Sequence, residues 1–363
     1  MLTPDQIMQA AVDADASDIH MEVGLPPTLR INGDLQKLDD DIITVDRAWA
    51  YIKHIARERH LDELGQKGGS DFAYEFNEIY FFRVSIFRQQ RRPGCVMRLI
   101  PPYKRSLEAI GLGEKVTEIL YKPRGLVLIT GPTGSGKSST LAAMIDHVNK
   151  HRSCNIITIE DPIEYRHDHG TSIVVQREVG EDIPSFEEAI VKALRQDPDV
   201  ILVGEMRNLE TIEAAIRAAE TGHLVFSTLH TTGAVRTVDR IVDVFPANHR
   251  DEVRMQLSGS LQCVISQQLL PLKDEEGRIA VFEIMFNTPS IAAYIRENKT
   301  FRITSDLQTG AKYGMTTMDA SLLKLYLAGR ITYQIMVERC YDRDSLDKLL
   351  RDAGAAMQSQ RAR

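Results

Sequence analysis

Residues 131–138 read GPTGSGKS, and their types and spacing suit the binding of a nucleoside triphosphate. They match the pattern GxxxxGK[ST], in which glycines let successive backbone N–H groups point at phosphate oxygens. In that pattern Lys137 reaches the β- and γ-phosphates and the Ser138 hydroxyl ligates Mg²⁺. The alternative, a glycine-rich turn that binds nothing, is disfavoured by the apolar strand GLVLIT before the loop and the amphipathic helix after it. The sequence therefore predicts a site for ATP and Mg²⁺ built from Gly131, Pro132, Thr133, Gly134, Ser135, Gly136, Lys137, Ser138 and Ser139.

Carboxylates follow two more apolar strands. Glu205 ends the strand VILVGE, where P-loop ATPases place a carboxylate that holds Mg²⁺ through water or polarises the attacking water. We therefore predict Glu205 as general base and as a metal contact. In ITIEDPIEY, the acids Glu160, Asp161 and Glu164 lie at the carboxyl end of another strand, and Glu160 and Glu164 are predicted to contact Mg²⁺. Carboxylates after strands also cap helices or face solvent, and that alternative stays open.

Two histidines flank the predicted strand in HLVFSTLH. His223 and His230 are seven residues apart, so their rings point to the same face only if the strand ends between them. His230 lies beside Thr228 and Thr231 at the strand end, where a sensor of the γ-phosphate would lie. For either histidine the alternative is an ordinary polar core or surface group.

Seven basic residues and no acidic one occur between positions 83 and 105, in a chain of formal net charge −7. Three interpretations are open: a nucleic-acid stripe, a solvated strand face, or arginines that reach the triphosphate of a neighbouring subunit. A regular strand does not put Arg83 and Arg88 on one face, so we expect different roles for them. The seven residues are Arg83, Arg88, Arg91, Arg92, Arg98, Lys104 and Arg105.

The elements that position these residues fall into two parts. Residues 1–105 predict a small α+β domain with a hairpin at Asn32-Gly33. Residues 106–120 contain glycines that interrupt the periodicity and are predicted as a linker. Residues 121–363 alternate short apolar strands with amphipathic helices, which predicts a parallel sheet in an α/β domain, and from about 245 onward the pattern is mostly helical.

The composition indicates in which cellular compartment the protein works and which classes of partner it binds. The four cysteines are far apart and form no CxxC pair, which is typical of a reducing compartment. No apolar run approaches the roughly 18 residues that a bilayer span requires, and the N-terminus has acidic residues in place of an apolar leader. We therefore expect a cytoplasmic protein without a membrane span. The net charge of −7 gives no global attraction to nucleic acid, although it does not exclude a local basic patch. No nucleic-acid partner is expected for the chain as a whole.

Four ordered motifs resemble those of the type II/IV secretion ATPase superfamily. GPTGSGKS, ITIEDPIEY, DPDVILVGEMR and AETGHLVFSTLHTT are similar to its Walker A, Asp box, Walker B and His box. The similarity continues through ASDIH, RIVDVFP, SLQCVISQQL and QTGAKYGMTTMDASL, a run that resembles the type IV pilus retraction ATPases. The resemblance implies an N-terminal PAS-like domain, a RecA-like ATPase domain with C-terminal helices, and a homohexameric ring whose ATP sites are shared by adjacent subunits.

The resemblance also implies roles for individual residues and a cellular task. Relatives that extend pili or serve type II secretion usually carry an extra N-terminal domain and a four-cysteine metal motif; neither is found here, so pilus retraction in twitching motility is expected. The motor would act on the inner-membrane pilus platform protein from the cytoplasmic side. A nucleic-acid-dependent ATPase and a nucleotide-gated binding module are the other hypotheses. The implied assignments are Glu205 as base, Glu164 near Mg²⁺, His230 and His223 near the γ-phosphate, and Arg83, Arg98 and Arg88 as arginines supplied in trans.

Overall fold

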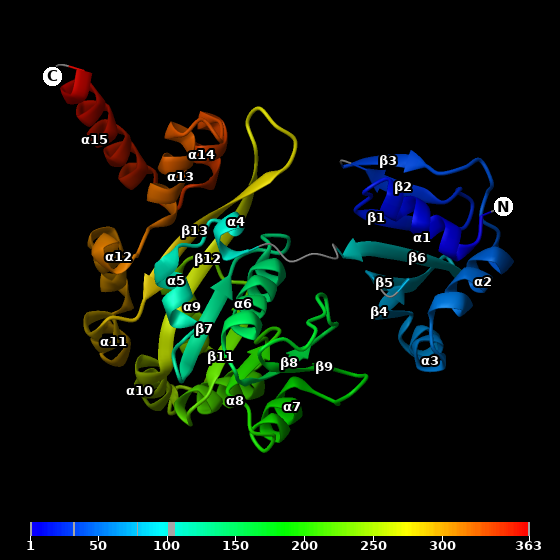
Figure 1. Cartoon of the computed structure of the whole chain (residues 1–363), viewed down its shortest axis with the longest axis horizontal. Coiled ribbons are helices and arrows are strands. Elements are labelled where there is room, and N and C mark those ends of the chain that lie inside the picture. The colour runs from blue at the N-terminus through cyan, green and yellow to red at the C-terminus, as the bar shows by residue number, and fades with distance from the viewer. Residues whose placement is uncertain (1, 32, 78, 101–105, 362–363) are drawn as a thin grey trace. The chain divides into compact units, whose positions relative to one another are not determined.

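The chain forms two compact units in the computed structural model, which describes residues 2–31, 33–77, 79–100 and 106–361 (Figure 1). The N-terminal unit comprises residues 1–104 together with the segment 162–166. The C-terminal unit comprises residues 105–161 and 167–363. The α/β fold class expected from the sequence is confirmed, with one sheet in each unit.

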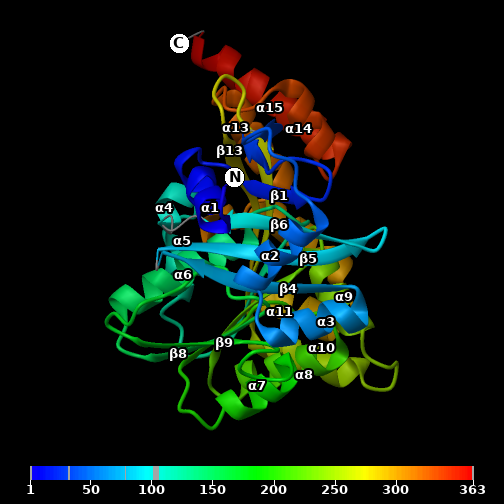
Figure 2. The ribbon, with the colours of Figure 1, turned by 90° about the vertical axis from the view of Figure 1, so that its right-hand side faces the viewer.

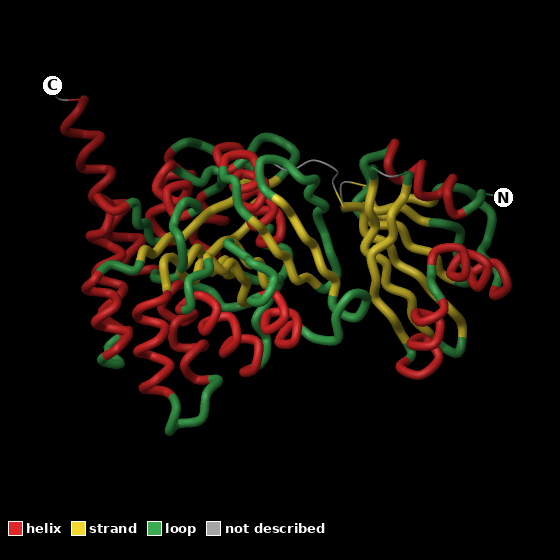
Figure 3. The backbone as a smooth tube through the Cα atoms, turned by 60° about the horizontal axis from the view of Figure 1, so that its bottom comes forward, coloured by secondary structure: helices red, strands yellow, loops and turns green. Residues whose placement is uncertain are grey.

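The N-terminal unit is a six-stranded antiparallel sheet of order β3-β2-β1-β6-β5-β4. Three helices pack on one face of it (Figures 2 and 3), because apolar side chains of the helices and of alternate strand positions share one core. The strands are β1 (Asp18–Glu22), β2 (Thr28–Ile31), β3 (Asp34–Lys37), β4 (Gly69–Phe76), β5 (Tyr80–Gln89) and β6 (Arg92–Ile100), and the helices are α1 (Pro4–Asp13), α2 (Val45–Ile55) and α3 (Glu58–Lys67).

Two local features shape this unit, a helix cap and a tight turn. Thr3 and Gln6 form a reciprocal capping box at the start of α1. Strands β2 and β3 pair from Ile31 to Asp34 around the expected two-residue turn, in which Gly33 has a φ of 94°. Asn32, the other turn residue, lies outside the described residues.

The C-terminal unit contains a seven-stranded sheet of order β13-β12-β7-β11-β10-β8-β9. All neighbours in it are parallel except the pair β12 and β13, and β7, β10 and β11 are buried along their whole length. The predicted parallel sheet is therefore confirmed, with one antiparallel edge. The strands are β7 (Gly125–Thr130), β8 (Asn155–Glu160), β9 (Ile173–Glu178), β10 (Val200–Val203), β11 (Leu224–Leu229), β12 (Leu261–Pro271) and β13 (Arg278–Phe286).

Strands β12 and β13 were not expected, and the interpretation of the segment after about 245 as mostly helical is wrong for them. A short run that mixes apolar and polar residues, such as that of β12, does not distinguish strand from helix by periodicity. The segment forms a strand because it pairs with β7, where Val264 and Ile265 lie opposite Leu128 and Ile129.

Helices cover both faces of this sheet (Figure 1). The predicted linker 106–120 contains α4 and α5, whose Leu107, Val116 and Ile119 are buried in the same core as β7 and α6. In the described part of the chain, no helix combines the length and apolar character needed to cross a bilayer. The helices are α4 (Leu107–Ile110), α5 (Glu114–Ile119), α6 (Lys137–His151), α7 (Phe186–Ala193), α8 (Leu209–Glu220), α9 (Ala234–Asp243), α10 (Arg250–Ser260), α11 (Pro289–Arg296), α12 (Ile303–Thr309), α13 (Met318–Leu327), α14 (Tyr333–Arg339) and α15 (Arg343–Arg361), with short 3₁₀ turns at Thr300–Arg302 and Gly310–Tyr313.

Candidate functional site

The glycine-rich loop connects buried strand β7 to helix α6, as the sequence predicts. Gly131 has a φ of 143° and Gly136 a φ of 89°, conformations that L side chains rarely adopt. A Cβ atom on Gly131 would lie 2.2 Å from the Gln267 carbonyl oxygen, and one on Gly136 would lie 2.9 Å from Gln267 Nε2. The backbone of β12 therefore excludes a side chain at Gly131, whereas at Gly136 it is the positive φ that favours glycine.

The loop has the polar groups that a phosphate would engage. Lys137 is only 9% exposed, and its Nζ donates hydrogen bonds to the carbonyl oxygens of Gly131 at 2.9 Å and Pro132 at 3.1 Å. The buried hydroxyls of Thr130 and Ser135 have no hydrogen-bond partner among the described residues. These orphaned donors and the N-terminus of the 15-residue helix α6 fit an anionic phosphate group.

The loop, Glu205 and His230 lie at one edge of the sheet. Strands β7, β11 and β10 are parallel, with Thr130 opposite Leu229 and Val203 opposite Ser227, so the residues that follow these strands emerge together. This edge is the carboxyl edge, where open α/β sheets bind ligands. The carboxyl edge of the C-terminal unit is therefore the candidate active site.

Glu205 and His230 approach each other at this edge. Glu205 Oε2 lies 3.5 Å from His230 Nε2 and 2.7 Å from Arg207 Nε, and the carboxylate is 14% exposed. The residues on either side of Glu205 are held by β11, because Thr228 Oγ1 donates to the Gly204 carbonyl at 2.7 Å and Met206 N donates to the Thr228 carbonyl at 3.0 Å. The structure thus joins two residues that the sequence predicts and adds Arg207, whose only sequence signal is its position two residues after Glu205 in GEMR.

His223 lies at the opposite edge of the sheet. It precedes β11, its carbonyl accepts a hydrogen bond from Gly125 N at the start of β7, and its ring Nδ1 is 3.0 Å from the Ala218 carbonyl oxygen. Strand β11 separates it from His230 by seven residue steps, about 23 Å at the usual rise of a strand. His223 therefore lies far from the P-loop of its own chain, and its contact with nucleotide stays a prediction.

Glu160 ends β8, three strand positions from β7. At the usual strand spacing this separation is about 14 Å. Its carboxylate accepts hydrogen bonds from Thr158 Oγ1 at 2.7 Å and Gln176 Nε2 at 3.1 Å. This position does not support Glu160 as a direct ligand of an ion that Ser138 holds. Within the described residues, no group of three His, Cys, Asp or Glu side chains is arranged to bind a metal by itself.

The predicted trans arginines lie on the sheet of the N-terminal unit. Arg83 of β5 and Arg98 of β6 are directly opposite each other in the antiparallel register, so their side chains share one face. Arg83 Nη1 lies 3.6 Å from Glu164 Oε1, and Arg98 Nε lies 3.0 Å from Asp18 Oδ1. Arg88 lies elsewhere, with its guanidinium 6.0 Å from the Trp49 ring centroid. The basic positions 104 and 105 are outside the described residues.

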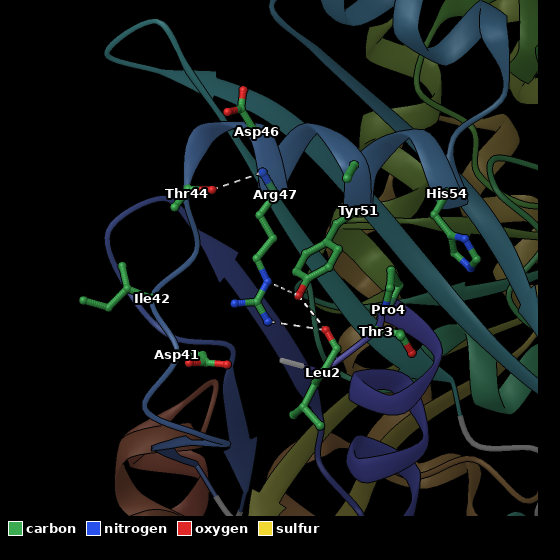
Figure 4. Close-up of a pocket in the computed structure, with 11 residues that line it drawn as sticks. Leu2, Thr3, Pro4, Asp41, Ile42, Thr44, Asp46, Arg47, Tyr51 and His54 are labelled. Atoms are coloured by element: carbon green, nitrogen blue, oxygen red, sulfur yellow. Dashed lines mark hydrogen bonds between the residues drawn. The ribbon is translucent and has the colours of Figure 1, made fainter.

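A pocket of about 590 Å³ lies in the N-terminal unit (Figure 4). The Tyr51 hydroxyl donates to the Leu2 carbonyl oxygen at 2.7 Å, and Arg47 donates to the Tyr51 hydroxyl at 2.5 Å and to the Leu2 carbonyl at 3.4 Å, which ties the chain before α1 to α2. Asp41 and His54 also line the pocket. The pocket contains none of the predicted nucleotide-site residues.

Comparison with known proteins identifies relatives over nearly the whole chain. The family model described as type II/IV secretion system protein matches residues 1–334. The type IV pilus retractation ATPase PilT of Pseudomonas aeruginosa is 46% identical over 327 residues, which cover 90% of this chain and 95% of that protein. The twitching motility protein of Neisseria gonorrhoeae is 46% identical over 320 residues, covering 88% of this chain and 86% of the relative.

A solved structure agrees with the fold as a whole. The crystal structure of the pilus retraction motor PilT with bound ADP matches with a TM-score of 0.89 at 43% identity, covering 96% of this chain and 100% of the other. The ATPase DotB of Legionella pneumophila matches with a TM-score of 0.78 at 28% identity, covering 92% and 95%. The chain therefore belongs to the type II/IV secretion system protein family and is a PilT-like ATPase within it.

Proposed function

We propose that this chain is the cytoplasmic, homohexameric motor that powers type IV pilus retraction, acting on the inner-membrane platform protein. The observation that carries the proposal is the carboxyl edge of the C-terminal sheet, where the phosphate loop, Glu205 and His230 occur together. The 46% identity to PilT over 90% of the chain supports retraction as the task.

In this proposal the loop binds the triphosphate of ATP. Lys137 exchanges its bonds to the Gly131 and Pro132 carbonyls for bonds to the β- and γ-phosphates, and the backbone N–H groups at the start of α6 hold the remaining oxygens. The Ser138 hydroxyl, together with Glu205, would hold Mg²⁺, which when bound offsets the charge on the phosphates.

Glu205 would accept the proton of the water that attacks the γ-phosphate. Its carboxylate is held by Arg207 and faces His230, so the base has a fixed orientation before substrate arrives. His230 would donate a hydrogen bond to the γ-phosphate as the charge on it changes. Arg83 and Arg98, which share one sheet face, and also Arg88, would come from the adjacent subunit, so hydrolysis would require the ring.

Twitching motility tests the proposed task. The chain would be expressed in Pseudomonas aeruginosa that lacks PilT, a strain expected to keep surface pili and lose twitching. Wild-type chain should restore twitching, and the Lys137→Ala variant, at equal abundance, should not. Loss of surface pili on deletion of this chain's own gene in its source organism would instead indicate extension and would contradict the proposal.

A nucleic-acid-dependent ATPase is the second candidate, because two arginines share an exposed sheet face in the N-terminal unit. Single-stranded DNA would then stimulate phosphate release, and the stimulation would fall steeply with salt. We expect no stimulation at any salt concentration. A clear salt-dependent stimulation would favour this second function over retraction.

A further inference from the structure

Glu283 is a buried carboxylate that has no part in the mechanism above. It lies on β13 and is 7% exposed. Its Oε1 accepts a hydrogen bond from Ala234 N, the first residue of α9, at 2.8 Å, and its Oε2 accepts one from Met318 N, the first residue of α13, at 3.4 Å. One side chain therefore joins the starts of two helices that are distant in sequence.

The first of these helices follows directly after His230. Four residues, 230–233, which we name the histidine segment, connect the end of β11 to α9. The segment is anchored at Gly233, whose N–H donates to Ser266 Oγ at 2.8 Å and whose carbonyl accepts from Thr237 Oγ1 at 2.8 Å. With Glu283 holding the next N–H, three side chains from different elements fix the end of the segment that carries His230.

The second helix continues the connection toward the C-terminal helices. Asp319 in the first turn of α13 is 5% exposed, and its carboxylate accepts hydrogen bonds from Tyr341 N at 2.7 Å and Asp342 N at 3.1 Å. The Tyr341 hydroxyl in turn lies 3.5 Å from Ser266 Oγ, which already holds the histidine segment. In Figure 1, α13 lies beside β13 with α15 next to it, so the contacts run from the phosphate edge to the C-terminal helices.

Burying the Glu283 carboxylate costs free energy, because the group loses its contacts with water. Desolvation raises the pKa of the Glu283 carboxyl above its usual value, and its two backbone hydrogen bonds oppose that rise. A side chain that only filled space at this position would be better apolar. A carboxylate is the group that accepts from two N–H donors at once, because the glutamine amide has one accepting oxygen and its NH₂ would face the other donor.

We infer that Glu283 is a positioning residue for ATP hydrolysis, which holds the histidine segment at the phosphate edge and ties it to α13 and the helices beyond. The inference rests on the proposed role of His230, since Glu283 acts through that ring. Loss of one of its two hydrogen bonds lets the segment move and separates His230 from Glu205.

Steady-state hydrolysis of MgATP by the full chain tests this inference. The isosteric variant Glu283→Gln should lower kcat by about fivefold or more and change the Kd of a fluorescent ADP analogue by less than about twofold. Its melting temperature should stay within about 2–4 °C of wild type, the shift that a change of roughly 1 kcal/mol gives a domain of about 150–250 residues. The matched control is Glu276→Gln, an exposed glutamate on the loop of the same hairpin, which should hydrolyse ATP like wild type.

Two outcomes would overturn the inference. Unchanged kcat in folded Glu283→Gln would show that the segment needs no such anchor. A parallel fall of kcat, ADP affinity and melting temperature would show a structural role only. If Glu283→Gln does not fold, Ser266→Ala removes the neighbouring anchor at Gly233 and should lower kcat in the same direction; unchanged turnover there counts against the inference.

His230→Ala separates this inference from the proposed function. If His230→Ala turns over like wild type, the role of His230 at the γ-phosphate fails, and positioning through it fails as well. If His230→Ala is slow and folded Glu283→Gln is normal, the proposed function stands and only the inference fails.

Discussion

The Glu205 carboxylate and the His230 ring face each other at the ends of two neighbouring strands, with Oε2 3.5 Å from Nε2. Glu205 follows β10 and His230 follows β11, and the parallel pairing of these strands brings the residues together although 25 positions separate them. The Glu205 carboxylate therefore lies where a general base for hydrolysis is expected.

Replacement of Glu205 by glutamine should stop hydrolysis and leave nucleotide binding intact. The amide keeps the size of the side chain but cannot accept the proton, and general-base catalysis contributes about 10²–10⁴-fold, so we expect a loss of about 100-fold or more in kcat. Phosphate release and binding of a fluorescent ATP analogue measure the two effects. Glu210→Gln, an exposed glutamate on the next helix, is the control. Unchanged turnover in Glu205→Gln would remove Glu205 as the base.

Replacement of Lys137 by alanine should abolish both binding and turnover. A ligand present at 100 times its Kd stabilises the folded state by about 2.7 kcal/mol, so ATP should raise the melting temperature of wild type and not that of Lys137→Ala. Differential scanning fluorimetry with and without MgATP measures this. Lys150→Ala, at the exposed end of the same helix, should keep the full rise. A normal ATP-induced rise in Lys137→Ala would contradict the assignment of the phosphate loop.

Two glycines of the loop should differ in their tolerance of alanine. A Cβ on Gly131 would lie 2.2 Å from the backbone of β12, whereas Gly134, at a φ of 77°, has open space around it. Gly134→Ala should cost about 1–2 kcal/mol, the strain of a left-handed conformation. Gly131→Ala should cost at least about 3 kcal/mol, because backbone must move as well. Urea unfolding at equilibrium compares the two free energies of unfolding, and equal losses would show that β12 does not press on the loop.

The stability contributed by Glu283 should depend on pH. The pKa of this carboxyl is raised from 4.5 in the folded state, chiefly by desolvation, so the folded state holds the proton more tightly than the unfolded state does. Stability from this group is therefore fully present below the unfolded pKa and is lost as the pH rises through the folded pKa.

Comparison with a variant that cannot ionise isolates this effect. The melting temperature of wild type minus that of Glu283→Gln should fall as the pH increases from 4.5 to 8. Asp319, whose pKa burial also raises, is present in both proteins, and its charge adds to the rise of the Glu283 pKa, so its effect acts in the predicted direction. A difference that is constant, or that grows with pH, would show that the carboxyl is not desolvated in the folded protein.

The sequence by itself determined the local elements of this protein. The phosphate loop has its own pattern, and the buried strands β7 and β11 are short apolar runs. The helix starts at Thr3, Ser185 and Asn208 have side chains of the types that cap helices, and in the structure each accepts a backbone N–H. Each of these signals spans a few neighbouring residues, so one sequence is enough to show it.

The tertiary structure determined which segments far apart in the sequence lie next to each other. Periodicity did not show that β12 pairs with β7 and presses on Gly131, and spacing did not show that the pairing of β10 with β11 brings His230 to Glu205. Both outcomes depend on the order of strands in the sheet, which is set by packing of segments far apart in the chain. Glu283 was missed for the same reason, because a lone glutamate in an apolar strand shows its two helix partners only after the chain has folded.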